Sequence, residues 1–160
     1  MLQNRKDHYF RKAKQEGFRA RSAYKLFEIN KKYNLIKKGD NVMDLGCSPG
    51  SWSQAASKIT GINGLVLGID ILPIKEIKNV QFIQADISDN ETLGKIKSVS
   101  EKFNVILSDM APKTTGIRDL DHNNSISLNE KAIEIAEKFL VKNGNFLCKV
   151  FQGGLFPEFL

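Results

Sequence analysis

Residues 44–52 read DLGCSPGSW, and this stretch decides the fold. An apolar segment ends at Asp44, two glycines and a proline break the chain, and a helical pattern begins at Trp52. Glycines between a strand and a helix form the nucleotide-binding turn of parallel α/β proteins. The stretch therefore predicts a strand, a ligand-binding turn and a helix.

Short apolar segments and amphipathic segments alternate along the rest of the chain. We expect strands at residues 41–45, 64–69, 80–84, 103–107 and 144–151. We expect helices at residues 22–32, 52–59, 90–100 and 127–141, and a polar loop at residues 112–125. Strands that are apolar throughout belong to sheets covered on both sides. The sequence thus predicts one compact α/β domain, Rossmann-like, with a mostly parallel twisted sheet and helices on both faces.

Charged residues stand at the ends of the expected strands. Asp44, Asp70, Asp86 and Asp109 end or follow the first four, and Lys149 lies in the fifth. One such aspartate is most often a helix cap or a turn residue, but four of them exceed what a sheet needs for stability. Ligands bind beyond the carboxyl ends of parallel strands, so we expect these residues to surround a site.

The glycine turn discriminates between nucleotide ligands. A dinucleotide turn has the pattern G-x-G-x-x-G, whereas this chain has only Gly46 and Gly50, and Pro49 removes an N–H donor. The bulky Trp52 would also crowd a diphosphate. Asp70 ends the second strand, where an acid usually binds ribose hydroxyls. This profile favours S-adenosylmethionine as the cofactor and disfavours a nicotinamide dehydrogenase.

Positive charge is concentrated in the first 38 residues. They hold twelve Lys or Arg against three Asp or Glu, a net charge of +9, whereas the whole chain has +6. We therefore divide the chain into a basic N-terminal helical segment, residues 1–38, that docks RNA, and a cofactor-binding domain, residues 39–160. The candidate RNA contacts are Arg5, Lys6, Arg11, Lys12, Lys14, Arg19 and Arg21. His8, Tyr9, Phe10 and Phe18 are candidates for stacking on bases; the alternative is a solvated helix without a partner.

Composition excludes several other classes of protein. Hydrophobic residues make up 41% of the chain and charged residues 26%, and no apolar run is long enough to span a membrane. Cys47 and Cys148 form neither a metal motif nor a disulfide framework, and His8 and His122 have no paired ligands. We expect His122 at the surface, no metal requirement, a cytoplasmic location and a monomer.

Several short motifs together resemble the FtsJ/RrmJ family of ribosomal RNA large-subunit 2′-O-ribose methyltransferases. They are RARSAYKL, DLGCSPGSW, GIDILP, QADISD, ILSDMAP and CKVFQG, in that order. The resemblance covers residues 5 to 155, and SDMAP followed by KVFQG, with RSAYKL in front, is its most specific part. It implies methyl transfer from S-adenosylmethionine to a ribose 2′-hydroxyl, that of a uridine, in large-subunit RNA or in the assembling 50S-type subunit.

The resemblance also implies roles for individual residues. Lys25, Asp109 and Lys149 match three members of the family's Lys-Asp-Lys-Glu catalytic set. The residues that match or surround its cofactor loop and cofactor-binding acids are Asp44, Gly46, Ser48, Pro49, Gly50, Trp52, Asp70, Asp86 and Asp109.

The chemistry of ribose methylation requires groups of this kind. A ribose hydroxyl is a poor nucleophile until its proton is removed, so a base must lie next to it. A lysine in water, with a pKa near 10.4, cannot serve as that base near neutrality, but burial and a neighbouring ammonium lower the value. We therefore expect Lys149 to be the base, Lys25 its like-charge neighbour and Asp109 the anion that orients it. The alternative for Lys149 is a strand-end lysine that extends to solvent.

The chain departs from the family pattern at its end. The family's catalytic glutamate lies some thirty residues beyond the second lysine, whereas the sequence ends at Leu160, and Glu158 does not match that position. We therefore expect a truncated C-terminus and an exposed sheet edge. Two alternatives stay open: a transfer-RNA 2′-O-methyltransferase, and a catalytically impaired relative that only binds RNA.

Overall fold

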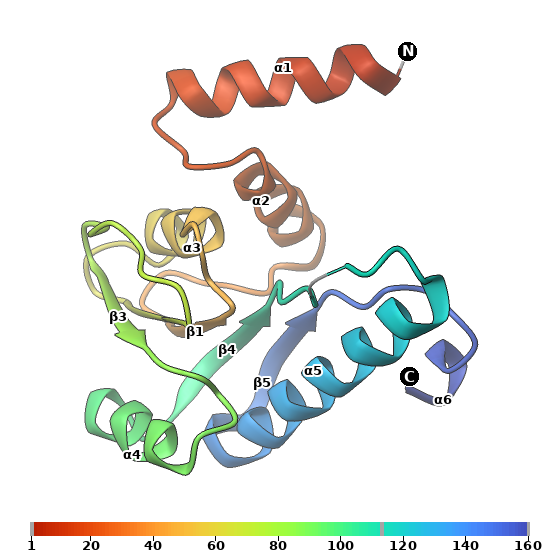
Figure 1. Cartoon of the computed structure of the whole chain (residues 1–160). Coiled ribbons are helices and arrows are strands. Elements are labelled where there is room, and N and C mark those ends of the chain that lie inside the picture. Colours follow the sequence, from red (N-terminus) through yellow and green to blue (C-terminus); the bar gives the residue numbers. More distant parts are fainter. Residues whose placement is uncertain (1, 113, 160) are drawn as a thin grey trace.

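Five parallel strands form a single sheet in the structure, a computed structural model that describes residues 2–112 and 114–159 (Figure 1). The strands are β1 (Asn41–Leu45), β2 (Leu65–Asp70), β3 (Val80–Gln84), β4 (Phe103–Ser108) and β5 (Leu140–Cys148). Their order in the sheet is β3-β2-β1-β4-β5, and every neighbouring pair is parallel. The predicted fold class is confirmed.

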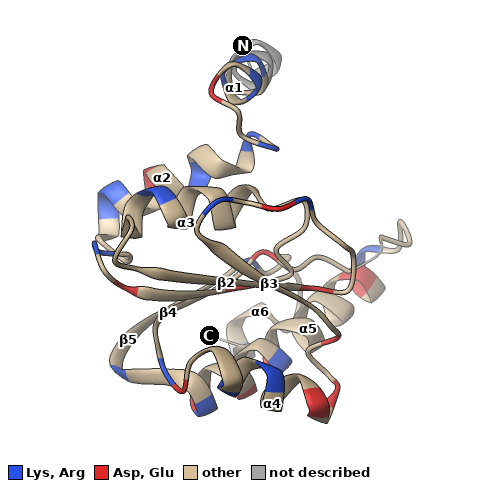
Figure 2. Cartoon of the chain, turned by 90° about the vertical axis from the view of Figure 1, so that its left-hand side faces the viewer, with Lys and Arg blue, Asp and Glu red and all other residues tan. Residues whose placement is uncertain are grey.

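Helices cover both faces of the sheet. They are α1 (Leu2–Gln15), α2 (Ser22–Tyr33), α3 (Ser51–Thr60), α4 (Asn90–Val99), α5 (Arg118–Phe139) and α6 (Phe156–Phe159). In the edge-on view of Figure 2, α2 and α3 lie on one side of the sheet and α4 and α5 on the other. No helix in the described part of the chain combines the length and the apolar character that a membrane crossing requires.

The core has two halves because side chains of a strand alternate between the two faces of the sheet. In β1, Val42 belongs to the half under α2 and α3, whereas Met43 and Leu45 belong to the half over α4 and α5. All three side chains are completely buried. Asp44, between Met43 and Leu45, is therefore directed toward α3, where Ser53 is also buried.

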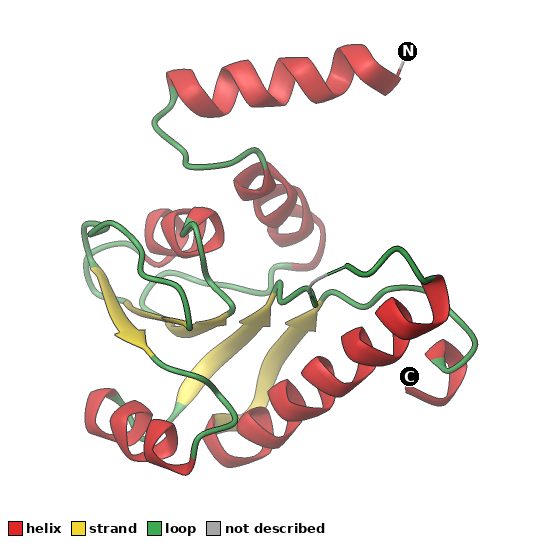
Figure 3. Cartoon of the chain, viewed as in Figure 1, coloured by secondary structure: helices red, strands yellow, loops and turns green. Residues whose placement is uncertain are grey.

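The start of α5 differs from the sequence prediction. The helix begins at Arg118 rather than at residue 127, so the polar loop is much shorter than expected (Figure 3). Asp121 stabilises this start, because its carboxylate accepts hydrogen bonds from the Thr115 N–H at 2.7 Å and the Gly116 N–H at 3.3 Å. The helical pattern is obscured in the sequence because the first half of α5 buries polar side chains, among them His122, Ser125 and Asn129.

The end of α5 and the bounds of β5 also differ. The helix ends at Phe139, not at residue 141, and β5 follows without a loop. The strand ends at Cys148 instead of residue 151. Beyond it, the Lys149 carbonyl and the Phe151 N–H bind side chains of α5.

Aromatic side chains within the N-terminal segment pack on one another. Phe18 makes edge-to-face contacts with Tyr24 and Phe27, and the ring of Tyr9 lies 5.3 Å from that of Tyr24. Phe18 is buried, so the expectation that it stacks on bases is wrong. Phe10, in contrast, is 63% exposed and is free of the aromatic cluster. The side chain of His8 lies outside the described part, as do those of Arg5 and Lys6.

Candidate active site

The register of the sheet brings Asp109 and Lys149 together. Ser108 of β4 pairs with Cys148 of β5, so the residue that follows each strand lies at the same edge. The Lys149 Nζ atom lies 2.5 Å from Asp109 Oδ1 and 3.2 Å from the Asp109 main-chain oxygen. Both side chains are partly buried. Two of the three predicted catalytic residues therefore form one ion pair at the carboxyl edge.

Helix α5 fixes the backbone on which Lys149 stands. The Lys149 N–H donates to the Ser108 carbonyl at 2.9 Å, and the Lys149 carbonyl accepts from Asn129 Nδ2 at 2.9 Å. One turn earlier in α5, the Ser125 hydroxyl accepts from the Phe151 N–H at 3.1 Å. The lysine thus extends from a main chain that is hydrogen-bonded on both sides.

His122 completes this set of contacts on α5. Its Nδ1 lies 2.8 Å from the Phe151 carbonyl, and its Nε2 lies 3.0 Å from the Leu155 nitrogen. A carbonyl can only accept and a backbone N–H can only donate, so Nδ1 is the donor and Nε2 the acceptor in these two contacts. His122 is 2% exposed, and the expectation that it lies at the surface is wrong.

The glycine turn after β1 is shaped by a close approach of the strands. Gly46 has φ +70°, and a Cβ atom there would lie 2.3 Å from the Met110 side chain. The turn is also tied to β2, because the Ser48 N–H donates to Asp70 Oδ2 at 2.8 Å. The other carboxylate oxygen of Asp70 accepts from the Leu72 N–H at 2.8 Å. Each oxygen retains a lone pair for a further hydroxyl.

A cavity of about 490 Å³ opens beside this turn. Gly46 and Ser48 line it from the turn, and three acids line it from the strand ends: Asp70, Asp86 and Asp109. A smaller pocket adjoins it, shares Gly46, Ser48 and Asp109, and reaches Asp44, Pro49 and Trp52. The structure therefore brings together eight of the nine predicted cofactor residues. Gly50 is not among them and contacts Arg19 and Ile77 instead.

Asp44 is an unusual buried acid. Its Oδ2 accepts from the Ser53 hydroxyl at 2.6 Å, while Oδ1 has no partner among the described residues. Burial raises the pKa of Asp44 to about 7, and the negative charges of Asp109 and Asp70 add to the rise, although the Ser53 hydrogen bond opposes it. An unpaired buried oxygen directed at a pocket is a candidate acceptor for a ligand's ammonium group.

Asp86 has a different environment at the mouth of the cavity. It is exposed, and its Oδ1 accepts from the Ser88 N–H at 2.8 Å. This hydrogen bond lowers the pKa of the Asp86 carboxyl, and the charge of Lys131 adds a smaller effect in the same direction.

Lys25 is not part of the Asp109–Lys149 ion pair, and Trp52 has a second role besides lining the small pocket. Lys25 is exposed on α2, and within the described chain no hydrogen bond or ion pair joins it to Asp109 or Lys149. Trp52 is buried, and its Nε1–H donates to the Ser22 carbonyl at 3.0 Å. Trp52 therefore lines the small pocket and also holds α2 against α3.

Sequence reasoning missed the residues that support the site. Ser53 on α3 and the α5 residues His122, Ser125 and Asn129 belong to no sequence motif considered above. The spacing of residues 122, 125 and 129 could have indicated the α5 residues, because these positions fall on one face of a helix. Met110 lines the larger cavity next to Asp109.

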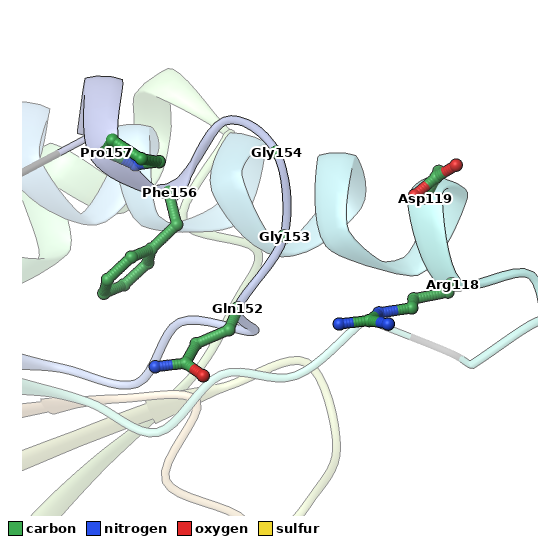
Figure 4. Close-up of a pocket in the computed structure, with 7 residues that line it drawn as sticks. All are labelled: Arg118, Asp119, Gln152, Gly153, Gly154, Phe156 and Pro157. Atoms are coloured by element: carbon green, nitrogen blue, oxygen red, sulfur yellow. The ribbon is translucent and has the colours of Figure 1, made fainter.

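A second cavity, of about 420 Å³, lies at the far end of the segment after β5. Arg118 and Asp119 line it from the first turn of α5, and Gln152, Gly153 and Phe156 line it from the other side. Figure 4 shows the Arg118 side chain extending toward Gln152. This cavity contains none of the predicted site residues.

The main cavity fits a cationic ligand without phosphate. Asp70 and Asp109 lie close enough to Asp44 for their negative charges to disfavour its ionisation. A diphosphate would add further negative charge to this cluster and would be repelled. A sulfonium or an ammonium would neutralise the cluster instead. Among the described residues, no group of three or more His, Cys, Asp or Glu could hold a metal ion.

The sheet order, the turn after β1 and the acids at its edge define a Rossmann-like methyltransferase fold. A solved structure of fibrillarin from Aeropyrum pernix with bound S-adenosyl-L-methionine shares this fold, with a TM-score of 0.54 at 20% identity over 71% of the chain and 46% of that protein. The chain belongs to the FtsJ-like methyltransferase family, which matches residues 18–160. The family inferred from the motifs is thereby confirmed.

Similar proteins include close bacterial and archaeal relatives. The chain is 51% identical to ribosomal RNA large subunit methyltransferase E of Bdellovibrio bacteriovorus, over 99% of the chain and 82% of that protein. It is 46% identical to the protein of the same name from Methanothrix thermoacetophila, of which it spans 62%. A structure from Plasmodium falciparum, described as a ribosomal RNA methyltransferase, has a TM-score of 0.83 at 32% identity, covering 88% of the chain and 82% of that protein.

The raised pKa of Asp44 leads to a prediction about stability and pH. The folded protein holds this proton up to about pH 7, whereas the ordinary value is 3.8. Its contribution to stability is therefore complete at acid pH and is lost as the pH rises from about 4 to 7. Asp44→Asn has no titrating group at this position. Relative to the wild type, its free energy of unfolding should therefore increase between about pH 4 and 7, and the difference should stay constant above pH 7.

Urea unfolding of both proteins at several pH values, without ligand, measures this difference. Glu101→Gln, at an exposed position between α4 and β4, is the control and should follow the wild type. A difference between Asp44→Asn and the wild type that does not change between pH 4 and 8 would contradict the assignment.

Proposed function

We propose that this chain transfers a methyl group from S-adenosylmethionine to a ribose 2′-hydroxyl, that of a uridine, in large-subunit ribosomal RNA. The observation that carries the proposal is the Asp109–Lys149 ion pair at the rim of an acid-lined cavity. We further propose that the protein acts as a monomer in the cytoplasm and without a metal.

The acids of the cavity support the choice of methyl donor. Asp70 would accept hydrogen bonds from the ribose hydroxyls of the donor, and Asp86, which lines the same cavity, would bind the adenine. Asp44 and Asp109 would face the positive charges of the methionine part. The donor supplies a methyl group that is already activated by its sulfonium, so the protein needs only to place it and to remove a proton from the acceptor.

Lys149 is arranged to accept that proton. To act as the base, Lys149 must first lose the proton of its ion pair with Asp109. The neutral amine would then have two N–H donors and one lone pair, and Asp109 offers Nζ two acceptors, Oδ1 and the main-chain oxygen. When both N–H groups are bound there, the lone pair is directed elsewhere and is available to the ribose hydroxyl. Lys149 Nζ would take the hydroxyl proton, and the donor would supply the methyl group to the ribose oxygen as its S–CH₃ bond breaks.

Lys25 would then act on the substrate side. It is exposed on α2, and its helix neighbour Ser22 lines the small pocket beside Asp109. An ammonium at this position would attract the RNA backbone and stabilise negative charge on the attacking oxygen. Its proposed role as a like-charge neighbour requires that it approach Lys149 when RNA is bound.

The basic N-terminal segment supports an RNA substrate. Figure 2 shows lysines and arginines on α1, α2 and their connection, with fewer acidic residues among them. Arg11, Lys14 and Arg21 are exposed, and Lys12 pairs only loosely with Glu16 at 3.9 Å. Phe10 adds an exposed ring for base stacking. We propose residues 1–38 as the RNA-docking segment, which includes Arg5 and Lys6, and residues 39–160 as the donor-binding domain.

The choice of ribosomal RNA rests on the relatives. Those reported above are named ribosomal RNA large subunit methyltransferase E, at 46–51% identity. The test is to incubate the protein with labelled S-adenosylmethionine and either large ribosomal subunits or bare transfer RNA, and then to map 2′-O-methyl groups. We expect one labelled uridine in the large subunit. Label in transfer RNA alone, or none with donor binding retained, would favour one of the two alternatives.

Replacement of Lys149 tests the proton acceptor. Lys149→Ala should lower kcat by a factor of about 10² to 10⁴, the usual contribution of a positioned base, and should leave donor affinity nearly unchanged. Single-turnover methylation and calorimetry with the donor measure the two quantities. Lys142→Ala, an exposed position on β5, is the matched control and should keep the wild-type rate. A wild-type rate for Lys149→Ala would exclude the assignment.

Neutralisation of the basic segment tests RNA docking. Replacement of Arg11, Lys12 and Lys14 by glutamine should weaken RNA binding and flatten its salt dependence, by roughly 0.7 to 0.9 in the log–log slope per lost phosphate contact. Donor affinity should not change. The control replaces Lys95, Lys97 and Lys102, which lie on the α4 side of the sheet. An unaltered slope in the first variant would mean that RNA binds elsewhere.

A further inference from the structure

Arg19 has an unusual set of contacts for a residue of the basic segment. It lies between α1 and α2, where an RNA contact was expected, but its guanidinium is turned inward. Its Nη1 donates to the Pro49 carbonyl at 2.8 Å, and its Nη2 donates to the carbonyls of Lys75 and Glu76 at 2.6 and 2.9 Å. One side chain therefore binds three main-chain oxygens in two different loops.

The backbone around Arg19 is fixed as well. Its N–H donates to Gln54 Oε1 at 2.9 Å, and Gln54 Nε2 donates to the Gly17 carbonyl at 3.0 Å. Gln54 belongs to α3, the helix that begins directly after the glycine turn. The guanidinium is thus presented from a backbone that is anchored to the same helix.

The glycine turn makes room for this contact. Gly50 has φ +105°, and a Cβ atom there would lie 2.8 Å from Arg19 Nη1 and 2.6 Å from the Ile77 side chain. Glycine at position 50 therefore allows the turn, the guanidinium and the loop of residues 71–79 to meet. Since Gly50 does not line the cavity, its contacts with Arg19 and Ile77 explain the residue better than direct contact with the donor.

The two loops that Arg19 joins are two walls of the donor cavity. Ser48 lines it from the turn that contains Pro49, and Ile71 and Leu72 line it from the loop that contains Lys75 and Glu76. We propose that Arg19 is a positioning residue that holds these walls together and so sets the affinity for the methyl donor. The inference rests on the proposed donor binding and gives part of the RNA-docking segment a second task.

Arg21 provides the comparison within the same segment. It is exposed, and among the described residues its side chain has no hydrogen bond or ion pair. Arginine binds several carbonyls at once through its planar fork, whereas lysine offers a single nitrogen. Arg19→Lys therefore keeps the charge that RNA would sense and removes the fork that joins the loops.

The experiment measures donor affinity and RNA affinity separately in Arg19→Ala, Arg19→Lys and Arg21→Ala. Calorimetry with S-adenosylmethionine should show a Kd raised by roughly tenfold in both Arg19 variants, since about that factor follows from the loss of one or two charge-assisted hydrogen bonds. Arg21→Ala should bind the donor like the wild type and should lower the salt slope of RNA binding. Arg19→Lys should keep that slope.

Each contrary result has a distinct meaning. Wild-type donor affinity in Arg19→Ala, with a reduced salt slope, would overturn the inference and make Arg19 an RNA contact. Wild-type donor affinity in Arg19→Lys would overturn the need for the fork. Absence of donor binding by the wild-type protein would instead refute the proposed function. Thermal melting of each variant guards against unfolding, and Arg19→Lys is the milder change if Arg19→Ala does not fold.

Discussion

The parallel register of β1, β4 and β5 is the constraint on which the site depends. Strands that run in the same direction end at the same edge, and their terminal side chains converge there. Ser108 pairs with Cys148, so Asp109 and Lys149 meet directly beyond them. A register shifted by one residue would turn one of these side chains to the opposite face of the sheet and separate the pair. The hydrogen bonds from α5 to residues 149–155 hold this end of β5 in place.

The convergence of strand ends has an electrostatic consequence. It places Asp44, Asp70 and Asp109 near one another, and their mutual repulsion contributes to the raised pKa of Asp44. Such an arrangement lowers the stability of the protein alone and becomes favourable when a positive ligand binds, which is a common property of functional sites. The unpaired Oδ1 of Asp44 belongs to the same arrangement.

The sequence predicted the parts of the fold that follow from local patterns. The strands are short apolar runs between amphipathic segments, and the acids at their ends follow from the sequence position alone. The early start of α5 could not be read in this way, because His122, Ser125 and Asn129 are polar and nevertheless buried. Their partners are main-chain atoms of residues 149–155, and no sequence pattern shows which backbone a side chain will bind.

The basic segment shows most clearly why composition alone underdetermines a site. A count of residues cannot distinguish among the twelve Lys and Arg residues of this segment, or among its aromatic rings. In the fold, some of these side chains are exposed and others bind or pack inside the protein. Phe18 fills the space between α2 and α3, while Phe10 is left exposed. Arg19 and Arg21 are two residues apart, yet one binds three carbonyls of the cavity wall and the other faces solvent. Gln54 and Arg19 join this segment to α3 and to the glycine turn, so the segment proposed to dock RNA and the cavity proposed to bind the donor share these contacts.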